Sequence, residues 1–511
     1  MFVRRLVNRS GSVSVQVIQK EHGRYRVVKT LGSATDPDEL ARLWSQAQRF
    51  IHPIDPAQTK LLAVRSMADQ TVAQAFARLT NASIRTIGPE RIFGTVFDRL
   101  GFGLVPGDLF RHLVLARLSY PTSKLKTVDY LERYCGRVIS VSAVYKFLDR
   151  LQAQHKTKVE QAAYQNTLAR LRGQLTVVFY DMTTLYFETE DEDDLKKIGF
   201  SKDGKFQCPQ IMLGLLVGPG GLPIGYDLFE GNTFEGHTLI PTLEKLRQRY
   251  DFSKPIVVAD AGLLSKPNLR ALTKADYQFI LGARIKNETD ELKRQILERT
   301  SQLTDGGSVV FDRLDGNRLV VTYADNRAKK DAHNRQRGLE KLKAKVKNGA
   351  LTKQHLTNRG YAKFLALSGE VTVAIDETKV TEDERWDGLK GYLTNTALDA
   401  PEVVANYRQL WHIERAFRIS KTDLRIRPIY HSVRRRIEAH LCIAFTAYAI
   451  WKEVEQLLVD AKVTMTAKRA AELTQTMYEV NYQLPDSSEV QRQVLQLDTE
   501  QQTLYDAVHP Q

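Results

Sequence analysis

The sequence predicts an α/β fold in which helices cover a mixed β-sheet. Between Leu175 and Ile285, three strand-like segments are followed by helix, strand, helix and strand, the succession that layered α/β folds have. Two of the strands, LTVVFYD and PIVVAD, are short apolar runs rich in β-branched residues, as buried strands are. The turn Gly218-Pro219-Gly220-Gly221 separates FQCPQIMLGLLV from PIGYDLFEG and predicts a hairpin.

The segments after this hairpin complete the core. An amphipathic helix over Thr238 to Tyr250 precedes PIVVAD, a helix begins at Lys266, and the strand YQFILGARI follows. This order is the one expected of a ribonuclease-H-like core. The strands SVVFDRL, NRLVVTYA, FLALSG and EVTVAID and a basic helix then interrupt it, so we predict a β-rich insertion. The core resumes at GYLTNT, with a long helix that starts near Pro401.

The first third of the chain is predicted to hold a β-hairpin and a helical region. The alternating segments SVSVQVIQ and RYRVVKTL predict the hairpin, and a helix follows from about Pro37. Further on, Gly136 ends one amphipathic helix and Ser140 caps the next, an order similar to a helix-turn-helix. Either this pair reads DNA, with Ser140, Ser142 and Lys146 facing a groove, or it is a simple helical hairpin.

These patterns divide the chain into six segments. They are the N-terminal β-hairpin and helices (1–85), a helical DNA-binding region (86–170), the first part of the core (171–285), the β-rich insertion (286–387), the second part of the core (388–458) and a polar, partly helical tail (459–511). A length of 511 residues is enough for two to four domains.

The composition favours a polyanionic partner. The formal net charge is +14 at pH 7, which suits nucleic acid but does not by itself establish it. Three cysteines without a CxxC pair indicate neither a zinc module nor a disulfide framework. The N-terminus lacks the apolar run of a signal peptide, and the longest apolar stretch, Leu441 to Trp451, is too short to span a bilayer. We therefore expect a cytoplasmic protein with no membrane partner.

Two aspartates stand where predicted buried strands end. Asp181 closes LTVVFYD and Asp260 closes PIVVAD. Carboxylates at such positions reach the sheet edge where substrates bind, and two of them can share a cation. Phosphoryl transfer on DNA requires Mg²⁺ ions, for which carboxylates are suitable ligands. An isolated aspartate at a strand end is more often a loop cap, so a third acid decides between the two interpretations.

A third acid lies in the helix that starts near Pro401. Tyr407, Glu414 and Lys421 follow one another at intervals of seven residues. Seven residues make about two helical turns, so the three are predicted to share one face. A stripe of hydroxyl, carboxylate and ammonium is poorly suited to a core, which favours a functional face. The alternative is an exposed face with ordinary charge pairs.

The helix inside the insertion is strongly basic. Between Arg327 and Lys347 it has nine Lys or Arg residues and two acids. Such a helix can neutralise several phosphates, and Lys329, Lys330 and Arg335 are its predicted DNA contacts. The alternative is a solvated helix without a partner.

Together these motifs resemble the DDE transposases of bacterial insertion sequences. VVFYDMTTLYF and VVADAGLLSKPNL look like the segments that carry the two aspartates, and the helix with Tyr407, Glu414 and Lys421 looks like the family's Y…E…K helix. The branch with a β-rich insertion is the most similar, with GNTFEGHTL, YADNRAKKD, WDGLKGYLTNT and RPIYHSVRRRIEAHL as further matches. The resemblance runs from about residue 90 to 456.

The resemblance implies a ribonuclease-H-like catalytic core in which Asp181, Asp260 and Glu414 hold two Mg²⁺ ions, with Mn²⁺ able to substitute. It implies that water and then a DNA 3′-hydroxyl are the nucleophiles, and that Tyr407 and Lys421 contact the phosphate backbone. The implied partners are double-stranded DNA, as the element's terminal inverted repeats and the target, and a second copy of the chain on that DNA. The implied location is the bacterial nucleoid.

One position departs from the family's pattern. The helix usually reads Y-x2-R-x3-E-x6-K, and Leu410 stands here at the arginine position. Arg418, one turn after Glu414, is our candidate for the missing backbone contact.

Two other functions stay open from the residues around the acids. One is a ribonuclease-H-like nuclease without strand transfer, and the other is a transposase-derived DNA-binding repressor. The N-terminal region and the basic insertion favour a protein that holds specific DNA ends, and the intact acids argue against a repressor.

Overall fold

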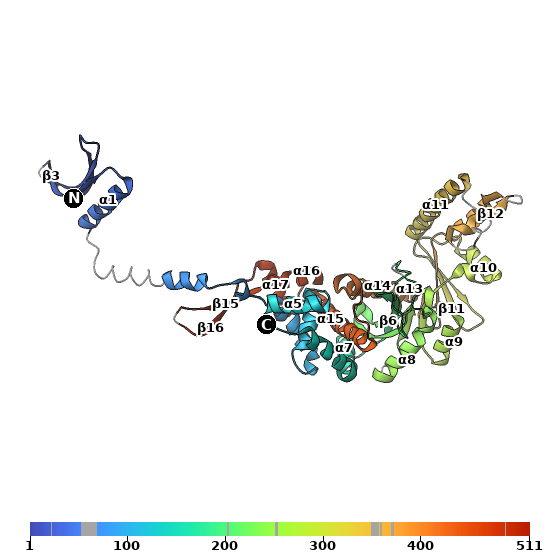
Figure 1. Ribbon diagram of the computed structural model, residues 1–511. Coiled ribbons are helices and arrows are strands. Elements are labelled where there is room, and N and C mark those ends of the chain that lie inside the picture. Colours follow the sequence, from blue (N-terminus) through green and yellow to red (C-terminus); the bar gives the residue numbers. More distant parts are fainter. Residues whose placement is uncertain are drawn as a thin grey trace. The chain divides into compact units, whose positions relative to one another are not determined.

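The computed structural model describes residues 1–21, 23–52, 69–201, 204–250, 254–348, 357, 360–368, 372–485 and 487–510. The chain forms two compact units, one of Met1–Ile84 with Glu479–Val494 and one of Arg85–Tyr478 with Leu495–Gln511 (Figure 1). The second unit contains the predicted core. In the described ranges, no helix has the length and apolar character needed to cross a membrane.

The first unit contains a three-stranded antiparallel sheet covered by a helix. The elements are β1 (Phe2–Val7), β2 (Val13–Glu21), β3 (Arg24–Ala34) and α1 (Pro37–Ile51). The predicted hairpin and the helix from Pro37 are therefore confirmed, whereas β1 was not predicted. Val15 and Val17 on β2 are buried with Ala47 on α1 and form a small core. A second hairpin, β15 (Tyr478–Gln483) and β16 (Val490–Val494), extends beside β4 (Ile84–Thr86).

The second unit is built on an eight-stranded mixed sheet with the order β10-β11-β14-β9-β8-β5-β6-β7. The strands are β5 (Val177–Tyr186), β6 (Gln210–Val217), β7 (Pro223–Glu230), β8 (Ile256–Ala259), β9 (Phe279–Ala283), β10 (Ser308–Asp312), β11 (Arg318–Tyr323) and β14 (Leu389–Thr394). β5, β8 and β9 are parallel, and the other neighbours are antiparallel. The five strands β5 to β9 form a ribonuclease-H-like core, as the sequence predicted.

Helices cover both faces of this sheet. α8 (Leu239–Tyr250) and α9 (Lys266–Lys274) bury Val178 and Tyr180, whereas Val177 and Phe179 contribute to the core that α13 (Ala400–Arg408), α14 (Trp411–Arg418) and α15 (Arg434–Asp460) cover. Successive residues of a strand point to opposite faces, so a strand that is apolar throughout is buried on both sides. The continuous run VVFY therefore specified a central strand of a three-layer structure.

The helical region packs around α15. Its helices are α3 (Thr95–Arg99), α4 (Leu109–Ser119), α5 (Lys124–Cys135), α6 (Val141–Arg150) and α7 (Lys156–Arg170). Gly136 ends α5 with φ +66°, a backbone conformation that favours glycine, and Ser140 Oγ accepts the Ala143 amide at 3.1 Å to cap α6. The predicted helical pair is thus confirmed as a structure. α16 (Ala467–Thr474) and α17 (Thr499–Val508) also pack here, so the tail is partly helical as expected.

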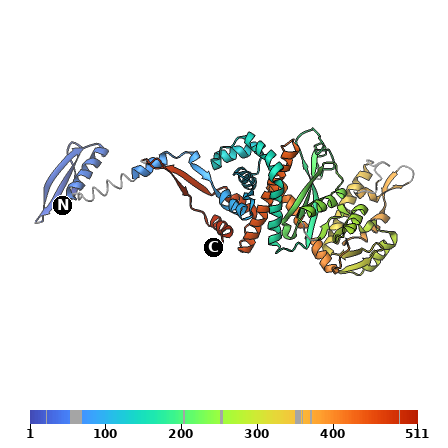
Figure 2. The same ribbon diagram turned by 90° about the horizontal axis from the view of Figure 1, so that it is seen from below.

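The insertion is continuous with the core sheet. β10 and β11 extend the sheet beyond β14, and only β12 (Leu365–Ser368) and β13 (Thr372–Ile375) form a separate hairpin. Three helices accompany them, namely α10 (Asp290–Thr300), α11 (Asp325–Lys347) and α12 (Glu377–Glu384). The four predicted strands are present, although residues 369–371 of the last pair lie outside the described residues. Figure 2 shows the core sheet with the helical region on one side and the insertion on the other.

Candidate active site

Asp181 and Asp260 lie side by side on the two central parallel strands. β5 and β8 pair in register up to Tyr180 and Ala259, so the next residue on each chain segment is one of the aspartates. Neighbouring strands lie about 4.8 Å apart, and residues in register point to the same face. Alternation along β5 places Asp181 on the face of Phe179, which is the face covered by α13, α14 and α15.

The prediction that Asp181 ends its strand is wrong. β5 continues to Tyr186, where it pairs with β6, and residues 182–185 are buried. The prediction failed because the apolar pattern resumes after a single charged residue. Asp181 marks the end of the parallel pairing with β8 and not the end of the strand. Its Oδ1 accepts the Met182 amide at 2.7 Å.

Tyr407 of α13 orients Asp260. Its hydroxyl donates a hydrogen bond to Asp260 Oδ1 at 3.0 Å, and the residue is 4 % exposed. Burial and the charge of Asp260 raise the pKa of Tyr407, so the hydroxyl keeps its proton and stays a donor. Gly282 of β9 makes this contact sterically possible, because a Cβ there would lie 2.6 Å from the hydroxyl oxygen.

Glu414 approaches the same site from α14, which packs over β5 and β6. The charges of Glu414 and Asp260 both act on Tyr407 and on Lys390 of β14. The Lys390 ammonium lies 4.4 Å from the centre of the Tyr407 ring. Burial and Arg327 lower the pKa of Lys390, whereas the two acids raise it. Lys390 thus brings a positive charge close to the acids.

Tyr407, Glu414 and Lys421 do not lie on one continuous α-helix, contrary to the prediction. α13 ends at Arg408, α14 begins at Trp411, and Lys421 lies in the π-helical turn Ile419–Asp423. A spacing of seven residues specifies one face only where the helix is unbroken. Glu414 nevertheless lies near Tyr407, because the charge of Glu414 influences the pKa of both Tyr407 and Lys390.

Leu410 lies at the break between α13 and α14. It is 7 % exposed and belongs to the main apolar core of the unit. An arginine at this position would bury its guanidinium, so the departure from the family's pattern follows from the local packing. Arg418 is exposed on α14, and Lys421 is half-buried.

The three acids offer the carboxylate oxygens that hard divalent cations prefer. Within the described ranges, however, no three His, Cys, Asp or Glu side chains are close enough to hold a metal ion together. The two aspartates therefore lie on adjoining strands, and Glu414 lies on the helix above them. The three carboxylates do not surround a single metal position. The carboxylate donors fit a hard divalent cation whose remaining ligands are water or substrate oxygens.

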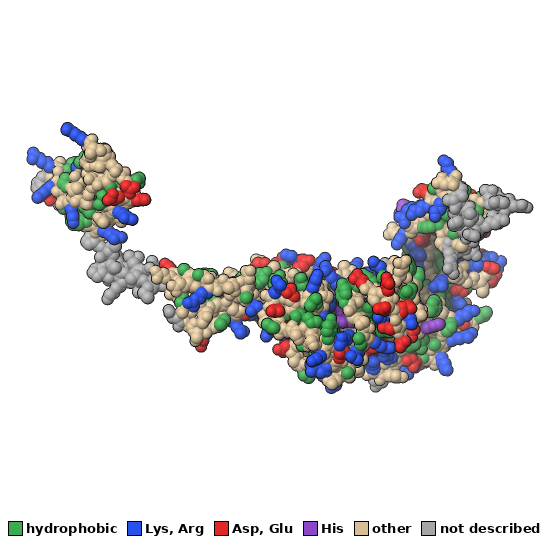
Figure 3. Space-filling model, viewed as in Figure 1, with side chains coloured by type: hydrophobic (Ala, Val, Ile, Leu, Met, Phe, Trp, Pro, Cys, Tyr) green, Lys and Arg blue, Asp and Glu red, His purple; other side chains and the backbone are tan. Residues whose placement is uncertain are grey.

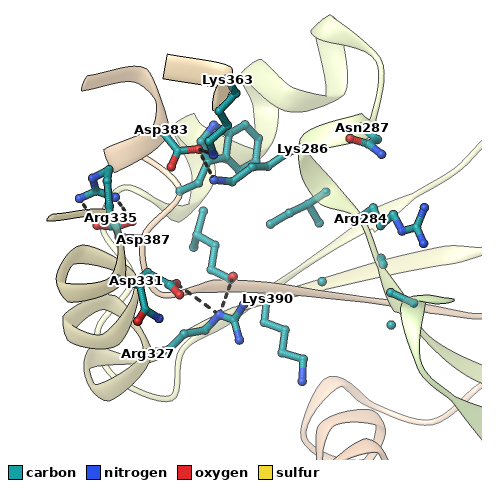
Figure 4. Close-up of a pocket in the computed structure, with 18 of the residues that line it drawn as sticks. Arg284, Lys286, Asn287, Arg327, Asp331, Arg335, Lys363, Asp383, Asp387 and Lys390 are labelled. Carbon is teal, nitrogen blue, oxygen red and sulfur yellow. Dashed lines mark hydrogen bonds and ion pairs between the residues drawn. The ribbon is translucent and has the colours of Figure 1, made fainter. Parts of the chain in front are cut away.

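A cavity of 710 Å³ opens beside Asp260 and Tyr407, where the insertion meets the core sheet (Figure 4). Its basic lining residues are Arg284, Lys286, Arg327, Arg335, Lys363 and Lys390. Aromatic side chains also line it, namely Tyr361, Phe364 and Trp386. Positive charge next to aromatic rings suits the phosphates and bases of a nucleic acid strand.

Aspartates hold several of these basic side chains in place. Asp383 accepts hydrogen bonds from Lys286 at 2.6 Å and from Lys363 at 2.7 Å. Both terminal nitrogens of Arg335 donate to the Asp387 carboxylate, at 2.6 and 2.7 Å, and Arg335 is 8 % exposed. Its guanidinium therefore fastens α11 to the segment before β14. Figure 4 shows Lys390 extending away from these pairs.

The other predicted DNA contacts lie on exposed helical surfaces. Lys329 and Lys330 are exposed on α11, where Figure 3 shows lysine and arginine side chains gathered. Ser140, Ser142 and Lys146 are exposed at the start of α6. The structure leaves all five accessible to a large ligand.

Sequence reasoning missed two residues of this site, Lys390 and Gly282. Gly282 interrupts the apolar strand FILGA, and a glycine inside a strand often marks the close approach of another group. Lys390 stands directly before GYLTNT, in a strand whose neighbours are buried, and this unusual position was a usable signal.

If Asp260 is a metal ligand and DNA is cleaved, as the sequence predicts, we expect Tyr407→Phe to raise the Mg²⁺ concentration needed for half-maximal DNA cleavage by roughly 10- to 100-fold, because the variant loses the hydrogen bond to Asp260. The ring and its packing against Lys390 remain, so folding is preserved. Cleavage measured across a Mg²⁺ titration tests this expectation.

Tyr392→Phe is the matched control. Its ring lies 4.8 Å from that of Tyr407, but its hydroxyl interacts with Thr322. An unchanged Mg²⁺ dependence in Tyr407→Phe, or an equal change in both variants, would remove Tyr407 from its positioning role.

Comparison with known proteins gives one family. The model of the transposase DDE domain matches residues 172–450, which is more than half of the chain and includes all three acids. A search of curated proteins found no match.

Among solved structures, the chain is similar to a piggyBac transposase synaptic complex with hairpin DNA, with 10% identity, 76% of each chain covered and a TM-score of 0.40. It is also similar to a Mos1 transposase paired-end complex with the left transposon end, with 13% identity, 33% of this chain and 56% of that chain covered, and a TM-score of 0.16. The family assignment rests on the domain match and not on these weak likenesses. The chain therefore belongs to the DDE transposase family, whose members are DNA transposases that cut and join DNA with the help of divalent metal ions.

Proposed function

We propose that Asp181, Asp260 and Glu414 are the metal ligands of this transposase and that the ions are two Mg²⁺, with Mn²⁺ as a substitute. The observation that carries the proposal is the register of β5 and β8, which sets the two aspartates next to each other below α13 and α14. The hydrogen bond from Tyr407 to Asp260 supports it, because it leaves the carboxylate in a fixed orientation.

When bound, the ions activate the attacking oxygen and stabilise the leaving oxygen of a phosphodiester. The protein side chains position the ligands and balance their charge. Tyr407 holds Asp260, and Asp181 and Glu414 offer oxygens from the neighbouring strand and from α14. Lys390 partly balances the negative charge of the acids and thereby lowers the cost of keeping them ionised close together.

We propose that the substrate is double-stranded DNA, first the terminal inverted repeats of the element and then a target, in the cytoplasm. The proposed backbone contacts are Lys421 and Arg418 near the acids, Lys329 and Lys330 on α11, and Ser140, Ser142 and Lys146 on α6. Arg335, which the sequence predicted as a contact, is assigned instead to holding α11 through Asp387. Coordinated cleavage of two ends calls for a homodimer assembled on DNA.

The test is incubation of the full chain with labelled DNA of the element's ends and a target plasmid, with Mg²⁺, Mn²⁺ or a chelator. We expect metal-dependent nicks at the ends and joined products with the target on a denaturing gel. Cleavage without any joined product would favour a nuclease, and binding without cleavage would favour a repressor. Either result would overturn the proposal.

We also expect the double variant Lys329→Gln/Lys330→Gln to bind DNA more weakly and with a lower salt dependence. Each phosphate contact that is lost lowers the slope of log K against log salt by about 0.9, so two contacts give about 1.8. Binding measured between low and moderate salt checks this number. Lys158→Gln/Lys274→Gln removes two exposed lysines from α7 and α9 and is expected to keep the original slope. Equal slopes in both double variants would exclude α11 from the interface.

A further inference from the structure

A second cavity, of 590 Å³, lies in the helical region and has a strongly basic lining. Its charged lining residues are Arg117, Lys124, Lys126, Arg425 and Arg427, and no Asp or Glu side chain is among the described residues that line it. They come from α4, from the first turn of α5 and from the segment after the π-helical turn. The cavity thus gathers several basic side chains, and Lys124 is of most interest because it is buried there.

Lys124 is the most unusual of these residues. It is 5 % exposed, and among the described residues the charge that acts on its ammonium is that of Arg117, which is also positive. Burial, and then the charge of Arg117, lower its pKa well below the ordinary value of a lysine. Burying an ammonium without a counter-charge is costly, so the position favours an anion in the cavity.

Arg117 lines the cavity and is held in place by two backbone carbonyl groups. It is 4 % exposed and donates hydrogen bonds to the carbonyl oxygens of Leu424 and Arg425, both at 3.3 Å. Its guanidinium therefore ties α4 to the segment that follows Lys421. The positive charge of Arg117 still adds to that of Lys124, because carbonyl groups do not neutralise it.

The two histidines of the lining add no negative charge to the cavity. Burial lowers the pKa of His431 to about 3, so its ring is neutral at pH 7. His440 has its Nε2 next to the Ile426 carbonyl at 3.1 Å, and its buried Nδ1 has no hydrogen-bond partner. Ser123 caps α5 at the same place, so the positive end of the helix dipole faces this region.

We propose that this cavity binds a phosphate group of the DNA backbone. The proposal rests on the proposed transposase function and extends it to a second anchoring point. α5 is the first helix of the helical pair predicted to bind DNA, and Arg425 and Arg427 follow closely after the segment that carries Glu414 and Lys421. Lys126 and Arg425 are exposed, so the positive charge continues from the cavity to the protein surface, where the rest of the DNA strand would lie.

The site links two parts of the transposase that must act on the same DNA end. A phosphate held between Lys124 and Arg117 would be fixed both to the helical pair and to the segment that follows the acids. The distance between the anchored phosphate and the phosphodiester bond that is cleaved would then be set by the protein and not by the flexible parts of the DNA.

Lys124→Met tests the proposal, because methionine fills the same space without charge. DNA binding is measured in a chelator, so that metal binding and cleavage play no part. We expect about tenfold weaker binding and a salt slope lower by about 0.9. Lys124→Arg retains the charge and is expected to recover most of the affinity. Lys158→Met, an exposed lysine of α7, is the matched control.

Thermal unfolding with inorganic phosphate separates the possible sources of the anion. We expect phosphate to stabilise the wild type and Lys158→Met but not Lys124→Met, which is also expected to unfold no earlier than the wild type without phosphate. Stabilisation by phosphate with DNA binding unchanged in Lys124→Met would assign the cavity to a free phosphate and overturn the DNA proposal. Unchanged responses to both ligands would overturn the site altogether. Neither result would alter the cleavage test of the three acids.

Discussion

Asp260→Asn is expected to reduce DNA cleavage by at least about 10³-fold while DNA binding stays close to that of the wild type. Ligation of the metal contributes several kcal/mol to the transition state, and each 1.4 kcal/mol corresponds to a factor of about ten in rate. Asparagine has the same shape and still accepts the hydrogen bond from Tyr407, so only the charge is lost. Single-turnover cleavage and a binding assay in a chelator measure the two effects separately.

The same loss is expected for Asp181→Asn and Glu414→Gln. Asp276→Asn is the control, because Asp276 carries an exposed ion pair with Lys254 at 3.0 Å away from the acids. Cleavage close to that of the wild type in any of the three variants would remove that residue from the metal site. Loss of DNA binding together with cleavage would instead indicate a folding defect.

Asp387→Ala is expected to destabilise α11 by about 3 kcal/mol, since it leaves the buried guanidinium of Arg335 without its carboxylate. Glu384 lies 3.5 Å from Arg335 Nε and compensates only in part. Hydrogen exchange of the α11 amides measures the local loss directly. Because Arg335 and Asp387 both line the cavity beside Asp260, weaker DNA binding is expected to accompany faster exchange.

Glu291→Ala is the matched control for this change. Glu291 also forms an ion pair with an arginine, Arg294, but both side chains are largely exposed. Exposed pairs contribute little to stability, so no change in the exchange of α11 is expected. Equal exchange in Asp387→Ala and the wild type would show that Arg335 does not hold α11.

The sequence predicted the core well where a single physical pattern determined the outcome. The run VVFY is apolar on both faces and lies in the central strand β5, and the glycine-rich turn after Val217 joined β6 to β7. The pairing of β11 with β14 was not predictable in the same way. NRLVVTYA identifies a strand but not its neighbour, because long-range pairing depends on the rest of the fold.

The candidate site was predictable in its residue types and less so in its geometry. The seven-residue spacing identified Tyr407 and Glu414, but the sequence does not show that α13 and α14 are separate helices with Leu410 buried between them. The buried ammonium of Lys124 was also hidden, since a lysine in the first turn of an amphipathic helix is normally solvated. Such features arise from tertiary packing, which local patterns do not encode.

The pairing of β11 with β14, and of β14 with β9, has a mechanical consequence. An insertion hung on flexible linkers could swing open and closed over its substrate. Here β11 of the insertion is joined to β14, and β14 to β9, by continuous backbone hydrogen bonds. The insertion therefore cannot hinge at this point without breaking these hydrogen bonds. The position of the insertion relative to Asp260 is therefore set by the backbone of the sheet, and adjustment between them is left to side chains and to the helices above the sheet.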